Sequence, residues 1–244
     1  MKIQAVLYDM DGQTLTRMFR DPALQMVSFT ITEKGYALRD MDGTLLDTEK
    51  LHKMAWTQCA AQRGVVIGPE FYQGAMGRNL QRVFALLREL YPNIGDTQAL
   101  YEEKEALCRA WMDEHGVPVL PGAHEALGAL GARGVRQCVC TSTSRDSAER
   151  TLAAAGLLPK IDALVCGDDI ERSKPDPQIF LRGAQKLGVP IERCAVVEDA
   201  PAGIAAGLAS GARVFCVPGL LEIPAADLAR CTRIGSLWEL ADRI

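Results

Sequence analysis

The tetrapeptide Asp-Met-Asp-Gly occurs twice near the start of the chain, at residues 9–12 and 40–43. The first copy places Asp9 and Asp11 at the end of an apolar run. An Asp-x-Asp pair in that position can supply a nucleophile and a proton carrier. Taken alone, such a pair more often marks a turn, so its meaning depends on the groups that face it.

Further polar residues stand at the ends of three later apolar runs. Thr141 ends the run "CVCT", Lys174 lies in "GDDIERSKPDP", and Glu198 and Asp199 end "AVVED". Each has an ordinary structural explanation, as a helix cap, a surface lysine or an acidic helix start. Because the carboxyl ends of parallel strands meet in one crevice, we expect these groups to converge.

The combined set suits phosphoryl transfer. Two or three carboxylates can hold Mg²⁺, which prefers oxygen ligands and offsets the repulsion between an anionic nucleophile and a phosphate. One aspartate can attack phosphorus, and the other can protonate the leaving oxygen and then activate water. A hydroxyl and an ammonium group can bind the transferring phosphoryl oxygens.

The elements that must position these residues follow a strand–helix alternation. Buried parallel strands are predicted by apolar runs at 3–8, 136–140, 163–166, 194–197 and 213–217. Helical patterns lie between the later runs, at 123–132, 145–155, 177–187 and 202–209. This order predicts an α/β fold, a Rossmann-like doubly wound parallel sheet.

Residues 48–117 show helical periodicity without a comparable strand signal. We interpret this block as a helical cap domain inserted after the first strand, where it can form a lid over the carboxyl edge of the sheet. The predicted domains are therefore an α/β core at 1–12 and 118–244, the cap at 48–117, and an insertion at 13–43.

Composition narrows the class of partner. The formal net charge of −4 without a basic run disfavours nucleic acid, and no apolar stretch approaches the roughly 20 residues that span a bilayer. The start of the chain lacks the pattern of a secretory signal. The eight cysteines are scattered, which favours buried reduced thiols. We expect a cytoplasmic protein that binds a small phosphorylated metabolite, with no membrane partner. The sequence carries no signal of an oligomer and is compatible with a monomer.

These motifs resemble, in order, those of the haloacid dehalogenase superfamily, in its β-phosphoglucomutase-like sugar-phosphatase branch. The likeness rests on "AVLYDMDG" with "TLLDTE", "CVCTSTSR", "SKPDPQIF" and "VVEDAPAGIAAGLASGA". The resemblance implies a Rossmann-like core, a helical cap, Mg²⁺ and an aspartyl-phosphate intermediate.

Roles for individual residues follow from the same resemblance. It implies that Asp9 is the nucleophile and Asp11 the general acid/base. The loop "GAMGRN" resembles a substrate-contacting loop, so Arg78 is expected to bind substrate. The remaining assignments are Thr141 and Lys174 on the transferring phosphoryl group, Ser142 on the substrate, and Asp9, Asp11, Glu198 and Asp199 on the metal.

The two Asp-Met-Asp-Gly copies have different flanks. "KIQAVLYD" before the first reads as a buried strand, whereas "EKGYALRD" before the second contains Arg39, a costly charge in a covered strand. Only the second is followed by "TLLDTE". Removing residues 13–43 joins the better halves, so we interpret that segment as an insertion that includes a predicted β-hairpin. Part of it resembles a stretch of the mannitol/uronate dehydrogenase family, whose catalytic residues lie elsewhere.

The first copy is therefore predicted to be the working pair, with residues 13–43 looped out near the cap hinge. In the alternative, residues 36–39 replace the first strand and Asp40 and Asp42 act. A third outcome is that the insertion obstructs cap closure and abolishes activity.

The predicted activity is Mg²⁺-dependent hydrolysis of a small sugar or sugar-alcohol phosphate. A phosphomutase of the β-phosphoglucomutase type remains the alternative enzyme. A catalytically impaired binding protein is the alternative outside catalysis.

Overall fold

A computed structural model describes residues 36–39 (backbone only), 41–42, 45–75, 78, 80–217, 221–237 and 239. Its core is a parallel sheet in the order β3-β2-β1-β4-β5-β6. The strands are β1 (Tyr36–Arg39), β2 (Arg136–Cys140), β3 (Ala163–Val165), β4 (Cys194–Glu198), β5 (Arg213–Cys216) and β6 (Thr232–Arg233). The predicted doubly wound α/β fold is confirmed.

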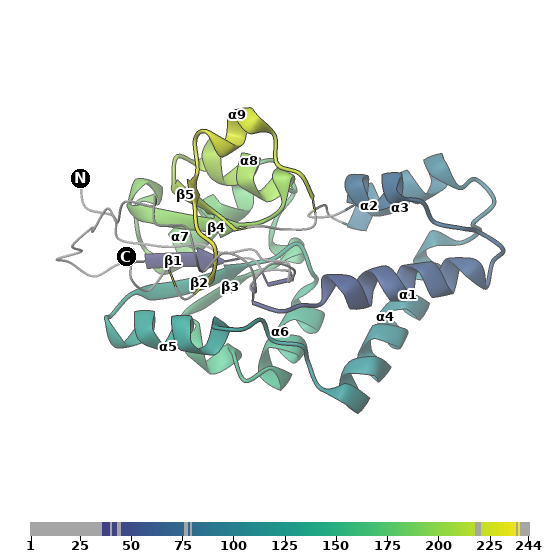
Figure 1. Cartoon of the computed structure of the whole chain (residues 1–244), viewed down its shortest axis with the longest axis horizontal. Coiled ribbons are helices and arrows are strands. Elements are labelled where there is room, and N and C mark those ends of the chain that lie inside the picture. The colour runs from purple at the N-terminus through teal and green to yellow at the C-terminus, as the bar shows by residue number, and fades with distance from the viewer. Residues whose placement is uncertain are drawn as a thin grey trace.

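Helices cover both faces of this sheet. Figure 1 shows α5 and α6 on one face and α7 and α8 on the other. Their bounds are α5 (Ala123–Ala132), α6 (Arg145–Ala154), α7 (Gln178–Leu187) and α8 (Pro201–Ser210), followed by the short α9 (Ala225–Leu228). All five residues of β4 are buried, as are the last four of β2. Burial on both faces explains why these strands are continuous apolar runs.

The central strand differs from the sequence prediction. β1 lies between β2 and β4 and is parallel to both, with Tyr36 in register with Arg136 and Cys194. Neighbouring strands are about 4.8 Å apart, so this position holds a single strand. Residues 36–39 are therefore part of the core sheet, whereas the sequence analysis assigned them to an insertion. Residues 3–8, predicted for this position, lie outside the described residues, as do residues 13–35.

The prediction against this strand rested on Arg39 as a charge within a strand covered on both faces. In the structure Arg39 is the last residue of β1, where the ladder ends.

The part of the chain between the first two core strands forms a helical cap. Its helices are α1 (Glu49–Ala61), α2 (Pro69–Ala75), α3 (Leu80–Leu90) and α4 (Thr97–His115). They share a hydrophobic cluster separate from that of the core, in which Trp56 meets Phe71 edge to face at 5.5 Å. Figure 1 shows these helices set to one side of the sheet. None of the helices in the described residues is long and apolar enough to cross a membrane.

Two adjacent chain segments join cap and core. The amide of Asp47 donates to the carbonyl of Pro118 at 2.8 Å, and the amide of Leu120 donates to that of Leu45 at 2.9 Å. The outgoing and returning connections are thus held side by side, which makes them the hinge of the cap.

Candidate active site

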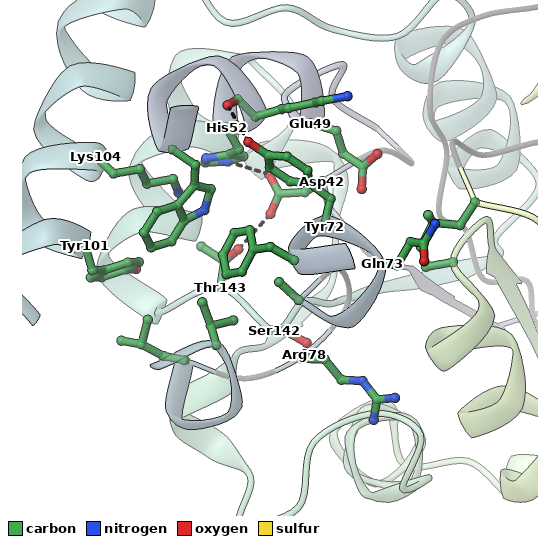
Figure 2. A pocket seen from close by; sticks show the side chains of 18 of the residues that line it. Asp42, Glu49, His52, Tyr72, Gln73, Arg78, Tyr101, Lys104, Ser142 and Thr143 are labelled. Carbon is green, nitrogen blue, oxygen red and sulfur yellow. Dashed lines mark hydrogen bonds and ion pairs between the residues drawn. The ribbon is translucent and has the colours of Figure 1, made fainter. Parts of the chain in front are cut away.

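A pocket of about 400 Å³ lies where the cap meets the core. Figure 2 shows residues that line it from both parts. The core contributes Asp42, Thr141, Ser142, Thr143 and Ala200, and the cap contributes residues that include Glu49, His52, Trp56, Tyr72, Gln73, Arg78, Tyr101, Lys104 and Glu105. The core side of the lining therefore has one carboxylate with several hydroxyls, and the cap side mixes aromatic rings with charged groups of both signs.

The Asp42 carboxylate in the pocket is contacted by three side chains. The hydroxyl of Thr48 donates to its Oδ1 at 2.7 Å, and the hydroxyl of Thr143 donates to its Oδ2 at 2.7 Å. His52 Nε2 lies 3.7 Å from Oδ1, close enough for an ion pair. Thr143 follows β2, whereas His52 belongs to the cap, so groups from both parts of the molecule hold this one side chain (Figure 2).

These contacts set the charges of the pair. Burial alone raises the pKa of Asp42, but hydrogen bonds from His52, Thr143 and Thr48 outweigh it and lower that pKa to about 2. For His52, burial and the charge of Lys104 lower the pKa, but the contacts with Asp42 and Cys108 raise it to about 9. The pair is therefore an aspartate and an imidazolium at neutral pH.

Stability should depend on pH through this pair. The His52 pKa rises on folding from 6.5 to about 9, so its contribution is complete below pH 6.5 and is lost as the pH rises through 9. The Asp42 pKa falls from 3.8 to about 2, so its contribution is complete above pH 3.8 and is lost in stronger acid. Between about pH 6 and about pH 9.5, we expect the wild type to lose roughly 1–3 kcal/mol of unfolding free energy that His52→Gln does not lose. Denaturant titrations of both proteins at the two pH values measure this difference. An equal change in unfolding free energy for the wild type and His52→Gln would contradict the prediction.

Lys174 and Glu198 form a buried ion pair, and neither is among the residues that line the pocket. Lys174 Nζ donates to Glu198 Oε1 at 2.6 Å, and both side chains are fully buried. The ammonium also lies 5.4 Å from the centre of the Phe180 ring. Glu198 thus serves as the partner of Lys174, a contact that the sequence analysis did not foresee when it predicted Glu198 as a metal ligand.

Gly203 provides the space that the Glu198 carboxylate occupies. A Cβ at this position would fall 1.8 Å from Oε1. Because the ion pair would have to move, we expect Gly203→Ala to reduce the unfolding free energy by about 2–4 kcal/mol in denaturant titrations. Gly128→Ala is the matched control, since a Cβ there meets nothing within 4 Å and α5 should gain up to about 1 kcal/mol. Equal effects of the two substitutions would contradict this account.

Thr141 lies at the carboxyl end of β2, as its sequence position predicts. Its side chain is buried, its hydroxyl accepts the amide of Thr143 at 3.1 Å, and it lines the pocket with Ser142. α6 begins at Arg145 with Ser144 in the N-cap position, so Thr141 does not cap this helix.

Arg78 reaches from the cap to the core backbone. Its Nη1 donates to the carbonyl oxygen of Lys174 at 3.1 Å. Figure 2 shows the side chain extending away from Asp42. Arg78 lines the pocket as predicted for a substrate-binding residue, but in this arrangement it also links the cap to the loop that carries Lys174.

Of the predicted metal ligands, the structure describes Glu198 and Asp199, and Asp199 is buried directly after β4. Within the described ranges, no group of three or more His, Cys, Asp or Glu side chains is arranged to hold an ion. Asp40 lies outside those residues, as do Asp9 and Asp11, whose roles stay predictions. The hard oxygen donors that are present suit Mg²⁺.

Sequence reasoning missed three pocket residues, His52, Thr143 and Lys104, and Thr48, which contacts Asp42. Thr48, His52 and Thr143 contact Asp42, and their only sequence signals were an isolated histidine and a run of hydroxyl residues. Lys104 is 5% exposed, pairs with Glu105 at 2.7 Å and lies 5.6 Å from the ring centres of Trp56 and Tyr101. A helical lysine next to a glutamate gives no sequence signal of burial.

This fold and site define an α/β enzyme with a helical cap over a charged pocket at the carboxyl edge of its sheet. The family model "haloacid dehalogenase-like hydrolase" matches residues 37–211. The chain therefore belongs to the haloacid dehalogenase-like hydrolase family, which confirms the predicted resemblance. The match begins within β1, and the resemblance to a dehydrogenase segment stays a prediction.

Individual relatives agree in fold and length. Hexitol phosphatase A of Escherichia coli is 34% identical over 195 residues, covering 78% of this chain and 86% of that protein. Fructose-1-phosphate phosphatase YqaB of the same organism is 34% identical, covering 70% and 90%. The crystal structure of a CbbY mutant from Rhodobacter sphaeroides with xylulose-(1,5)-bisphosphate superposes with a TM-score of 0.72 at 25% identity, covering 85% and 98%.

Proposed function

We propose that this protein hydrolyses the phosphate monoester of a small sugar or sugar alcohol, with Asp40 as nucleophile and Asp42 as acid/base. The observation that carries the proposal is the position of Asp42, which faces the pocket and is held by donors from core and cap. Asp40 and Asp42 take the place of Asp9 and Asp11 because the strand preceding them is the central strand of the sheet.

The reaction is written in two steps. A carboxylate oxygen of Asp40 attacks phosphorus, the ester P–O bond breaks, and the leaving oxygen takes a proton through Asp42. Water then attacks the aspartyl phosphate, the bond between Asp40 and phosphorus breaks, and the proton of the water passes to Asp42. Thr141 and Lys174 bind the phosphoryl oxygens in both steps.

The proton for the first step is stored in the Asp42–His52 pair. At neutral pH the carboxylate is ionised and the proton resides on His52, since the two pKa values are about 2 and about 9. A bound phosphate adds negative charge beside Asp42 and favours transfer of that proton to the carboxylate. His52 then returns the pair to its starting state.

Magnesium would be held by Asp40 and Asp199, which offer hard oxygen donors. When bound, the ion supplies charge that offsets the repulsion between nucleophile and substrate. Removal of divalent ions with EDTA is expected to abolish turnover, and added Mg²⁺ is expected to restore it.

The cap wall indicates the leaving group. Trp56, Tyr72 and Tyr101 present aromatic surface to the pocket, whereas Gln73 and Lys104 offer polar groups. This mixture suits a polyol, which has apolar C–H faces as well as hydroxyls. The relatives named as hexitol and fructose-1-phosphate phosphatases support the same substrate class.

Two cap cations favour hydrolysis over phosphomutase action. A mutase must also bind a second phosphate at the cap end of its bisphosphate intermediate. Here Arg78 donates to the Lys174 carbonyl, and Lys104 is paired with Glu105. The Glu105 carboxylate beside Lys104 adds repulsion against a second dianion.

The deciding experiment measures inorganic phosphate release from hexitol, hexose and pentose monophosphates at saturating Mg²⁺. We expect turnover of at least one hexitol or hexose phosphate, with no requirement for a bisphosphate activator. Formation of an isomeric phosphate in place of inorganic phosphate would indicate the mutase. Binding of these compounds without any turnover, with p-nitrophenyl phosphate also stable, would indicate the impaired binding protein.

The cellular setting is also part of the proposal. Seven of the eight cysteine side chains are buried. Burial raises the pKa of several of them, including Cys166 and Cys194 to about 12, which keeps them as unreactive thiols. These features support a cytoplasmic protein that acts on a small phosphorylated metabolite.

A further inference from the structure

The ring of His52 lies between two side chains from different elements. Its Nε2 is 3.7 Å from Asp42 Oδ1, and its Nδ1 is 3.4 Å from the sulfur of Cys108. His52 belongs to α1 and Cys108 to the middle of α4, 56 residues further along the chain. The thiol therefore connects a second cap helix to the carboxylate of the active site.

Packing fixes the position of the sulfur. Cys108 is 1% exposed and forms a small hydrophobic cluster with Leu51 and Ala55 of α1. Trp111 and Met112, which follow on α4, pack against this cluster. A side chain held in this way cannot turn toward solvent, so its sulfur is a fixed contact for the histidine.

The thiol discriminates between the two orientations of the ring. With Nδ1 at the sulfur, Nε2 faces Asp42. A half-turn about the Cβ–Cγ bond places Cδ2 at the sulfur and Cε1 toward Asp42, which removes both polar contacts. The imidazole nitrogens are chemically distinct, and the partner of one determines what the other can do.

We propose that Cys108 is a positioning residue for catalysis, which holds His52 in the orientation that serves Asp42. The inference rests on the proposed role of Asp42 as acid/base. Cys108 does not touch the substrate; its sulfur contacts Nδ1, and Nε2 faces the carboxylate. Loss of the thiol contact leaves the ring free to turn and reduces the fraction of molecules with Nε2 at Asp42.

Three variants test this in steady-state kinetics. Cys108→Val removes the sulfur and adds one methyl group, and we expect kcat to fall about tenfold with KM within about twofold. Cys108→Ser keeps an acceptor and is expected to retain kcat within about twofold of wild type. Cys59→Val is the control for loss of a buried cap thiol, because Cys59 is 3% exposed on α1 and is expected to leave kcat unchanged.

A second measurement does not depend on turnover. In ¹⁵N-histidine NMR spectra, assigned with His52→Asn, the Nδ1–H of His52 should be protected in the wild type and in Cys108→Ser. It should exchange rapidly in Cys108→Val. Identical His52 signals in all three proteins, or a kcat loss in Cys108→Ser equal to that in Cys108→Val, would overturn the proposal. A wild type that cleaves no phosphate ester would refute the proposed function alone, and the NMR result would still decide the orientation.

Discussion

Asp40→Asn is expected to reduce kcat for phosphate release by about 10⁴-fold or more, whereas Asp9→Asn should leave kcat within about twofold. The reason is the sheet: β1 leads directly into Asp40, and its ladder occupies the position between β2 and β4. The two substitutions change the same residue type in the same tetrapeptide, so each is the matched control for the other. Activity that depends on Asp9 and survives Asp40→Asn would establish the first copy as the working pair.

Deletion of residues 13–43 tests whether the two Asp-Met-Asp-Gly copies are equivalent. Removing residues 13–43 deletes β1 and joins "AVLYDMDG" to "TLLDTE". We expect this shorter chain to be active and Asp9→Asn to abolish its activity, because only one Asp-x-Asp pair remains. A folded but inactive deletion chain would show that residues 3–8 cannot replace β1. Higher activity in the deletion chain than in the full chain would show that the extra segment hinders the cap.

The second large effect concerns the buried pair of Lys174 and Glu198. Lys174→Met leaves a fully buried carboxylate without its ammonium partner, which should lower the unfolding free energy by about 3–5 kcal/mol. It should also abolish phosphate release, since the ammonium is proposed to bind the phosphoryl group. Denaturant titration and the phosphate assay measure the two consequences separately.

A double variant separates stability from chemistry. Lys174→Met combined with Glu198→Leu removes both charges and should recover most of the lost stability, because an apolar pair can replace a buried ion pair at little cost. Activity should remain absent. Recovery of phosphate release in the double variant would mean that Lys174 has only a structural role.

Much of the core could be predicted because its signals are local. β2 and α5 have the bounds predicted from their apolar patterns, and the remaining core strands from β3 to β5 differ by one residue. A strand buried on both faces must be apolar throughout, so the sequence carries this information directly. β6 was missed because a strand of two residues has no pattern.

The errors arose where position in space decides the role. Arg39 argued against β1 because sequence alone does not show that the strand ends there. The pairing of Glu198 with Lys174, 24 residues earlier, could not be predicted because it is a tertiary contact, and the metal role of Glu198 stays a prediction. The isolated His52 and the hydroxyl run that contains Thr143 were weak signals, because such residues acquire a role only when a distant carboxylate lies within reach.

The two side-by-side connections between cap and core have a consequence for cap opening during turnover. A cap that swings about this hinge must carry His52 away from Asp42 and withdraw Arg78 from the Lys174 carbonyl. These contacts between cap and core therefore also hold the cap closed and slow product release. An enzyme built in this way gains an organised site at the expense of its opening rate.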